Sequence, residues 1–391
     1  MLVIMFRLLY CVLLLSLVAC KKTSKTDVTT PIRTALAAEL PEIQRIMDDP
    51  ESHGVQVVFS RITYDPSGKP VFDDFFYRAK DSLYFYPAST VKFPMAILAM
   101  ERIKEKKWMN RNTRFFLEEE KEETTVAEAV RQIFAVSDNR AFNRLYEFLG
   151  TDYVNQKMKD KGLQPFRLSH RLSVEHAADI ATKPIVAYKN DTTLVQLFSS
   201  YNSAPDTLDL REVSKGKGYI KDSVLVEGPM DFSLKNYYPV KTLHNTMKRL
   251  IFPQLYPEKH QFDLRAEDRK FLLYAMKATP EEAGYDALKY PESYDRFFLF
   301  GDTVATIPEN LEIYNKVGYA YGTLTDCAYI KDKESGVEFI LTATVTVNDN
   351  GILNDGVYAY KEKGLPFLAE LGRQIYHNEL LAISANRNHL K

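Results

Sequence analysis

The chemistry of this sequence is most apparent at Ser89 and Lys92, which stand three residues apart at the head of the apolar run FPMAILAM. On a helix, residues i and i+3 lie on one face a turn apart, so the amine of Lys92 can reach the hydroxyl of Ser89. A neutral amine can take the hydroxyl proton while the oxygen attacks a carbonyl carbon. Partial burial supplies the neutral form because it lowers the pKa of a lysine. The pair predicts a nucleophilic serine with Lys92 as its base.

Two further clusters follow in the chain, Ser137-Asp138-Asn139 and Lys316-Val317-Gly318. Each signal has a plain structural alternative: Ser89 could be the N-cap of a core helix, and a Ser-Asp-Asn run between two helices is often only a cap. Three such clusters in one chain are more specific than any one of them.

The elements that must position these residues can be read from periodicity. Residues with helical spacing or caps predict helices at 31–49, 89–100, 126–136, 138–150, 151–161 and 365–381. Residues rich in β-branched and aromatic types predict strands at 55–64, 71–78, 311–316, 322–331 and 336–348. Residues 182–301 show no clear overall pattern. We interpret them as an extended helical subdomain with insertions, with helical stretches near 242–255 and 266–279 and polar segments such as 201–206 and 214–218.

Strands at both ends with helices between them predict an α+β fold. We expect one antiparallel sheet built from both chain ends and flanked by helices, with an inserted helical subdomain. The predicted domain covers residues 31–391, with the sheet part at about 31–88 and 302–391 and the helical subdomain at about 89–301.

The N-terminus has the pattern of a targeting segment. Residues 1–19 are apolar with a single Arg7, too short for a comfortable membrane span, and predict a secretory signal. The tetrapeptide Leu-Val-Ala-Cys ending at Cys20 resembles a bacterial lipobox, which implies a lipidated cysteine, followed by a polar tether at 20–30. An uncleaved anchor helix is the alternative. Both interpretations place the rest of the chain outside the cytoplasm, in the bacterial cell envelope, either facing the periplasm or on the outer membrane.

Composition limits the partners. The chain has 391 residues and a net charge of −1, so we expect no attraction to nucleic acid and a small-molecule substrate, with the membrane contacted only through the lipid. Of the three cysteines, Cys11 lies in the signal and Cys20 carries the lipid, which leaves Cys327 with no disulfide partner. No Cys/His cluster is visible in the sequence, so we expect no metal or other cofactor, and we expect a monomer.

The three clusters, in this order, resemble the S-x-x-K, S-D-N and K-T-G motifs of class A β-lactamases and penicillin-binding D,D-peptidases. The resemblance spans roughly residues 55–381. It implies that Ser89 attacks the acyl carbonyl and that Ser137 relays the proton to the leaving nitrogen. Asn139 would hydrogen-bond the acylamino group of the substrate, and Lys316 would attract its carboxylate.

The resemblance also implies an oxyanion hole made by the backbone N–H groups of Ser89 and of Tyr319, which follows Gly318. The implied substrate is a β-lactam or a peptide that ends in D-alanine.

Two departures from the family pattern stand out. Val317 replaces the usual Thr or Ser, which removes a hydroxyl and predicts weaker carboxylate recognition, by about 1–3 kcal/mol. The Glu-x-x-Leu-Asn run that activates the deacylating water in class A enzymes is missing. Glu175, with Asp179 behind it, is the only carboxylate we nominate for that role, and an exposed structural glutamate is an equal alternative. Without such a base, the acyl-enzyme would recover slowly.

Three functions therefore remain open. The leading one is a class A β-lactamase-like serine hydrolase that works through an acyl-Ser89 intermediate. The second is a D,D-peptidase or esterase on the same scaffold. The third is a non-catalytic ligand-binding or sensor lipoprotein, which Val317 favours and the retention of the other motif residues opposes.

Overall fold

The computed structural model describes residues 30–120 and 122–389, with side chains described up to residue 385. The predicted signal peptide, the lipidation site Cys20 and nearly all of the predicted tether lie outside the described residues. Within the described ranges, no helix combines the length and apolar character needed to span a membrane. Residues Pro31–Lys391 form one compact unit.

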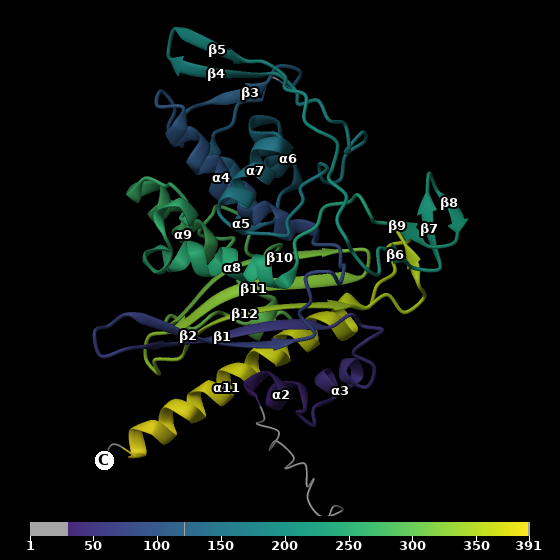
Figure 1. Cartoon of the computed structure of the whole chain (residues 1–391), viewed down its shortest axis with the longest axis vertical. Helices are drawn as coiled ribbons and strands as arrows, with labels where there is room; N and C mark the ends of the chain where they lie inside the picture. Colours follow the sequence, from purple (N-terminus) through teal and green to yellow (C-terminus); the bar gives the residue numbers. More distant parts are fainter. Residues whose placement is uncertain (1–29, 121, 390–391) are drawn as a thin grey trace, which may run out of the picture. The chain divides into compact units, whose positions relative to one another are not determined.

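A five-stranded antiparallel sheet joins strands from the two ends of the chain (Figure 1). Its strands, in spatial order, are β10 (Leu311–Ala320), β11 (Thr323–Asp332), β12 (Glu338–Thr346), β1 (Gln56–Tyr64) and β2 (Pro70–Tyr77). The N-terminal and C-terminal parts meet where β1 pairs with β12, from Gln56 opposite Thr344 to Arg61 opposite Phe339. The predicted sheet from both chain ends is confirmed.

Three helices cover one face of this sheet: α2 (Pro31–Leu36), α3 (Pro41–Met47) and α11 (Leu365–His389) (Figure 1). Their apolar side chains share a core cluster with inward-facing residues of the strands, such as Phe59 and Leu341. The prediction of one helix over 31–49 is wrong. Leu40 is extended and Pro41 begins a second helix, because the residue before a proline is driven out of the helical conformation.

The other face carries the helical layer. It contains η2 (Ala88–Val91), α4 (Lys92–Glu105), α5 (Val126–Ala135), α6 (Asn139–Leu149), α7 (Thr151–Asp160), α8 (Val240–Ile251), η3 (Pro253–Leu255), η4 (Glu258–His260), α9 (Ala266–Lys277) and the short α10 (Phe297–Phe300). The predicted caps form: Thr125 accepts a hydrogen bond from the amide of Glu128 at 3.0 Å, and Asp138 accepts one from Ala141 at 2.7 Å. Helix α4 is buried along its first ten residues, which places it at the centre of the layer.

The helical stretches predicted near 242–255 and 266–279 correspond to α8 and α9, whereas residues 185–231 of the predicted helical subdomain form short strands. Two small sheets contain β3 (Phe115–Leu117), β4 (Ile185–Asn190) and β5 (Thr193–Leu197), and β6 (Ser214–Lys215) with β9 (Met230–Asp231). A third joins β7 (Gly218–Lys221) and β8 (Val224–Glu227) to β13 (Ile352–Leu353). Asp222 and Ser223 both have positive φ, 50° and 64°, which is the backbone of a tight hairpin turn. Short strands with this kind of turn have too few apolar residues to show a clear period.

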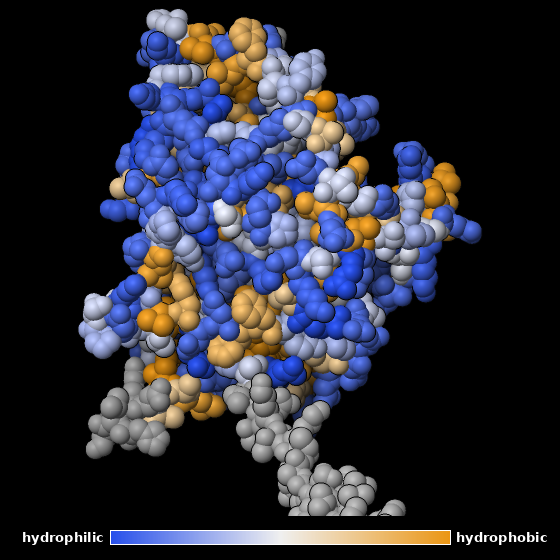
Figure 2. Space-filling view, in the orientation of Figure 1, coloured by the Kyte–Doolittle hydropathy of each residue, from blue (hydrophilic) through white to orange (hydrophobic). Residues whose placement is uncertain are grey.

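The surface view in Figure 2 shows a largely hydrophilic face over the helical layer, with apolar side chains gathered at the β7–β8 hairpin. The exposed apolar residues of this hairpin include Val224 and Leu225. The hairpin contacts the C-terminal part of the chain: β7 pairs with β13, and the side-chain amide of Asn354 donates to the carbonyl of Ile220. The middle of the chain therefore packs beside the segment that follows the main sheet.

Candidate active site

Ser89 lies in the 3₁₀ turn η2, which leads directly into the buried helix α4. The turn is closed by the hydroxyl and amide of Thr90, which both donate to the carbonyl of Pro87, at 2.7 and 3.0 Å. The N-cap of α4 is Val91, without a side-chain cap bond, so Ser89 is not the cap of this helix. The serine is partly exposed and lines a cavity of about 620 Å³. The fold thus presents Ser89 to an open cavity from a rigid support.

Lys92 is fully buried and donates hydrogen bonds to the second motif. Its Nζ contacts the carbonyl oxygen of Ser137, and it lies 2.6 Å from Asn139 Oδ1 and 3.4 Å from Ser137 Oγ. Among the hydrogen bonds of the described residues, those of Lys92 reach Ser137 and Asn139 and not Ser89. Burial lowers the pKa of Lys92 well below its ordinary value, and the nearby charge of Lys316 lowers it further. A lowered pKa is the property that a lysine needs to act as a general base.

Ser137 lies between two lysines. Lys316 Nζ donates to Ser137 Oγ at 2.9 Å and to the carbonyl of Val317 at 3.0 Å. Burial lowers the pKa of Lys316, while Asp295 and Asp326 act in the opposite direction. Ser137 has a φ of 55°, a left-handed conformation that costs a non-glycine residue about 1 kcal/mol and is concentrated at functional sites. The second and third motifs thus meet at one hydroxyl group.

Gly318 allows the edge strand β10 to touch the Ser89 turn. A Cβ atom at this position would lie 2.8 Å from the carbonyl oxygen of Pro87 and 2.8 Å from the amide nitrogens of Ser89 and Thr90. Only glycine permits this approach without a shift of the backbone. The contact places the edge strand against the Ser89 turn one residue before Tyr319, whose amide is the second oxyanion donor implied by the resemblance.

The side chain of Val317 points away from the cavity. It is 1% exposed and belongs to the apolar cluster on the α11 side of the sheet, whereas Lys316 reaches the helical layer, because side chains alternate along a strand. A threonine here would bury its hydroxyl in the core. The weaker carboxylate recognition predicted from Val317 therefore does not follow from this geometry.

Glu175 is exposed and does not line the Ser89 cavity. It lines a neighbouring cavity of about 1000 Å³, and Asp179 lies along the same wall. Ser173 is the loop residue that reaches the site: its Oγ accepts a hydrogen bond from Asn139 Nδ2 at 2.9 Å, and it lines both cavities. This role of Ser173 was not predicted, since nothing in the residue types of the loop shows which side chain faces Asn139.

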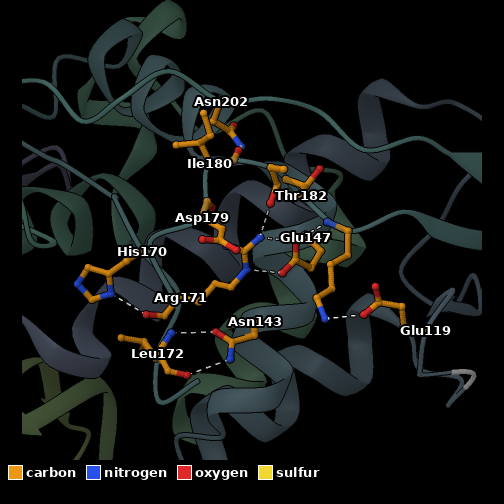
Figure 3. A network of polar contacts seen from close by, with 12 residues as sticks. Glu119, Asn143, Glu147, His170, Arg171, Leu172, Asp179, Ile180, Thr182 and Asn202 are labelled. Atoms are coloured by element: carbon orange, nitrogen blue, oxygen red, sulfur yellow. Dashed lines mark hydrogen bonds and ion pairs between the residues drawn. The ribbon is translucent and has the colours of Figure 1, made fainter. Parts of the chain in front are cut away.

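An ion pair holds this loop against helix α6 (Figure 3). Arg171 donates to both carboxylate oxygens of Glu147, at 2.5 and 2.9 Å, and also to the carbonyls of Asp179 and Ala181, at 2.8 and 2.7 Å. Asn143 adds a reciprocal pair of bonds with the backbone of Leu172, at 3.0 and 2.9 Å. These contacts fix the path of the loop on both sides of Ser173.

Three buried charged residues beneath the site were not predicted. Arg296, Asp295 and Asp326 are each at most 4% exposed. The Asp326 carboxyl is so deeply buried that its pKa rises to about 6, and it accepts bonds from Asn315 Nδ2 and the amide of Phe298. In the sequence these residues look like ordinary surface charges. In the part of the chain that the structure describes, no three His, Cys, Asp or Glu side chains form a group that could hold a metal ion.

Comparison with known proteins agrees with this geometry. The model of the beta-lactamase enzyme family matches residues 69–200, which include the first two motifs. Two similar solved structures are a β-lactamase from Sphaerobacter thermophilus and one from Xanthomonas campestris pv. campestris, each 14% identical with a TM-score of 0.50. The first match covers 90% of this chain and 97% of that chain, and the second covers 88% and 96%. At this identity, the likeness to the two structures establishes the fold alone.

A search of curated proteins gave no match. The match over residues 69–200 and the shared fold nevertheless agree with the three motifs. The predicted resemblance is therefore confirmed: the chain has the β-lactamase fold, and its residues 69–200 match the beta-lactamase enzyme family.

Proposed function

We propose that this protein is a serine hydrolase that forms an acyl ester on Ser89, and that it hydrolyses the amide bond of a β-lactam. The observation that carries the proposal is the contact between the two lysines and Ser137, next to a serine that lines an open cavity. Acyl transfer needs a nucleophile, a base with a lowered pKa and a hydroxyl that can relay a proton, and Ser89, Lys92 and Ser137 are candidates for these roles.

In the proposed reaction, the Ser89 oxygen attacks the carbonyl carbon and its proton passes to Lys92. The Ser89 and Tyr319 amides stabilise the negative oxygen of the tetrahedral intermediate. The bond between the carbonyl carbon and the leaving nitrogen breaks as Ser137 donates its proton to that nitrogen, and Lys92 passes the proton taken from Ser89 on to Ser137. Water then splits the acyl-Ser89 ester, which releases the acid and restores the serine. Asn139 holds Lys92 in place and binds the acylamino side of the substrate, and Lys316 orients Ser137.

Intact-mass measurement tests the proposal on the full chain in detergent, incubated with a chromogenic cephalosporin. We expect an adduct of one acyl group on Ser89, and its lifetime reports deacylation. The Ser89→Ala variant should form no adduct. A Ser89→Ala variant with full activity, or a complete lack of both adduct and turnover, would refute the β-lactam proposal.

A D,D-peptidase or esterase is the second candidate, because none of the described residues that line the Ser89 cavity is a carboxylate that could activate water. Glu175 would have to act from the neighbouring cavity. The Glu175→Gln variant discriminates the β-lactamase from the peptidase or esterase. If the variant keeps a persistent acyl adduct while the parent protein turns over rapidly, Glu175 is the residue that activates water for deacylation. A persistent adduct in both proteins supports the peptidase. A non-catalytic sensor would form no covalent adduct at all.

The proposal also includes attachment to the bacterial cell envelope through a lipid on Cys20, with the enzyme acting as a monomer. The Leu-Val-Ala-Cys sequence supports the lipid. The Cys20→Ala variant should move from the membrane fraction to the soluble fraction of a bacterium that expresses it. Light scattering of the purified Cys20→Ala protein, measured without detergent, reports its oligomeric state.

A further inference from the structure

A second cavity adjoins the cavity that Ser89 lines. It has a volume of about 1000 Å³, compared with about 620 Å³ for the Ser89 cavity, and three residues line both: Asn139, Leu172 and Ser173. The side-chain amide of Asn139 donates to Ser173 Oγ at 2.9 Å, so these two side chains form the boundary between the cavities. Asn139 is also the residue proposed above to bind the acylamino side of the substrate. A group attached beyond the acylamino group would therefore reach the second cavity.

The loop that walls the second cavity is fixed in place before any ligand binds. Arg171 donates to both carboxylate oxygens of Glu147, and Asn143 exchanges hydrogen bonds with the backbone of Leu172 (Figure 3). A wall that is already ordered loses little conformational entropy when a ligand binds against it. The second cavity is thus suited to hold part of a substrate.

The charges that line the second cavity are not balanced. Of the described residues that line it, five carry a carboxylate and three are cations: Glu119, Glu120, Glu147, Glu175, Asp179, Arg140, Arg171 and Lys183. Each of the three cations already has an ionic partner in the lining. The pairs are Arg171 with Glu147, Lys183 with Glu119, and Arg140 with Glu120.

Two carboxylates on the loop remain without an ion pair. Among the described residues, no ion pair includes Glu175 or Asp179, and both side chains are exposed. The charge of Arg171 acts on Asp179 as well as on Glu147, but one guanidinium group cannot neutralise two carboxylates. This wall therefore has a negative potential that attracts a cation.

We propose that the second cavity binds the acyl side of the substrate and selects an acyl group that carries a protonated amine. This inference rests on the acyl-serine chemistry proposed above. The amine lies near Glu175 and Asp179, and the chain that links it to the acylamino group crosses the boundary formed by Asn139 and Ser173. The second cavity increases the rate of acylation by holding the substrate, while the attack by Ser89 is unchanged.

Matched chromogenic cephalosporins test this preference on the full chain in detergent, at pH 8 and low ionic strength. One pair carries a 6-aminohexanoyl or a hexanoyl group on its acylamino side, and a second pair carries an 8-aminooctanoyl or an octanoyl group. At pH 8 an alkyl amine is protonated, whereas an ordinary imidazole is neutral. We expect kcat/KM, which reports acylation, to be about fivefold higher for the aminated member of at least one pair, the range of two exposed ion pairs. Equal kcat/KM values within both pairs, or faster reaction of the unaminated members, overturn the inference.

Variants of the two carboxylates show whether they are the groups that bind the amine. The measured quantity is the ratio of kcat/KM for the aminated over the unaminated member, which cancels a general loss of activity. Asp179→Asn should lower this ratio about twofold, and the double variant Glu175→Gln/Asp179→Asn should lower it to about one. Asp191→Asn removes an exposed carboxylate outside the cavity lining, so it should keep the parent ratio. A double variant with the parent ratio contradicts the proposal.

The unaminated cephalosporins separate this inference from the proposed function. If intact mass shows an acyl adduct on Ser89 and the aminated members have no advantage, the acyl-serine chemistry holds and the inference about the second cavity fails. If no member of either pair forms an adduct or is turned over, the proposed function fails, and the inference fails with it.

Discussion

Lys92 donates its hydrogen bonds to Ser137 and Asn139, although its place one turn from Ser89 suggested a direct contact. The Lys92 amine is therefore held by Ser137 and by the side chain of Asn139. Its lowered pKa comes first from burial, which requires that no water solvates the amine. This is a property of the packed helix α4 and could be anticipated from the apolar run at residues 93–100.

The first prediction concerns the proton on Lys92. Lys92→Arg places a group that stays charged at any accessible pH, so we expect the rate of Ser89 acylation to fall by at least about 100-fold. In the parent protein, the acylation rate should rise with pH because only the neutral amine of Lys92 accepts the proton. Since the pKa of Lys92 is lowered, the rate should become constant at a pH well below the ordinary pKa of a lysine. Stopped-flow acylation by a chromogenic cephalosporin, followed over pH, measures both.

Lys104→Arg, the same change at a partly exposed site on the same helix, serves as the control and should keep the parent rate. A Lys92→Arg protein that acylates at the parent rate would remove Lys92 from the role of base.

The sequence allowed the five motif residues to be chosen because their order and spacing are distinctive: Ser89, Lys92, Ser137, Asn139 and Lys316. The structure brings them together. Ser173 and Asp295 could not be chosen in the same way, since each owes its position to contacts made far away in the chain. The Asp295 side chain has a buried oxygen with no hydrogen-bond partner among the described residues, a feature that no sequence pattern reveals.

Strand β10 packs against turn η2, and this contact depends on Gly318. We expect Gly318→Ala to push the strand from the turn, because a Cβ atom would meet three backbone atoms at 2.8 Å. Overpacking of this kind costs about 1–3 kcal/mol and misplaces the two proposed oxyanion donors. Urea unfolding should show the loss of stability, and acylation should slow more than stability alone explains.

Gly68→Ala provides the comparison, since no heavy atom lies within 4 Å of the added methyl group, although its φ of 81° adds backbone strain. This variant should lose stability through the strain while acylation of Ser89 stays near the parent rate. Equal losses of acylation in both variants would argue against a special role for the contact of β10 with η2.

The loop that carries Ser173 leads to the third prediction. Glu147→Gln leaves Arg171 buried without its ionic partner, and we expect the free energy of unfolding to fall by about 3 kcal/mol. Glu119→Gln, which removes an exposed partner of Lys183 in the same network, should cost less than about 1 kcal/mol (Figure 3). Urea titration of both variants measures the difference. Similar small effects would show that the ion pair does not hold the loop.

Elements with a strong local signal were predicted well, including the capped helices α5 and α6 and the three C-terminal strands. The strands between 185 and 231 were not. Each is only two to six residues long and gains its stability from pairing with distant segments, as β7 does with β13. Pairing with distant strands determines the conformation of such segments, because their own residues have little preference for the strand conformation.

Stability of the whole protein should depend on pH through His170. Its ring is buried against Tyr86, and burial lowers its pKa from the ordinary 6.5 to about 4. Between these values the unfolded chain binds a proton that the folded protein does not. The free energy of unfolding should therefore be intact above pH 6.5 and fall by about 3 kcal/mol as the pH drops to 4.

Urea unfolding at several pH values measures this slope. His170→Gln should reduce the slope, while the buried His244, whose pKa is also lowered, continues to contribute. His377→Gln, at an exposed position, should leave it unchanged. A His170→Gln protein with the parent slope would show that another group is responsible.

At the level of the whole chain, the α+β architecture followed from strands at both ends and helices between them. The pairing of β1 with β12 has a consequence for folding. The partners are separated by more than 270 residues, so the sheet cannot close until the C-terminal strands have been synthesised. Ser89 emerges early, yet Lys316 and the edge strand beside it come late. A fragment that ends before β10 would carry the nucleophile without the strand and lysine beside it, so the acylating activity can appear only in a nearly complete chain.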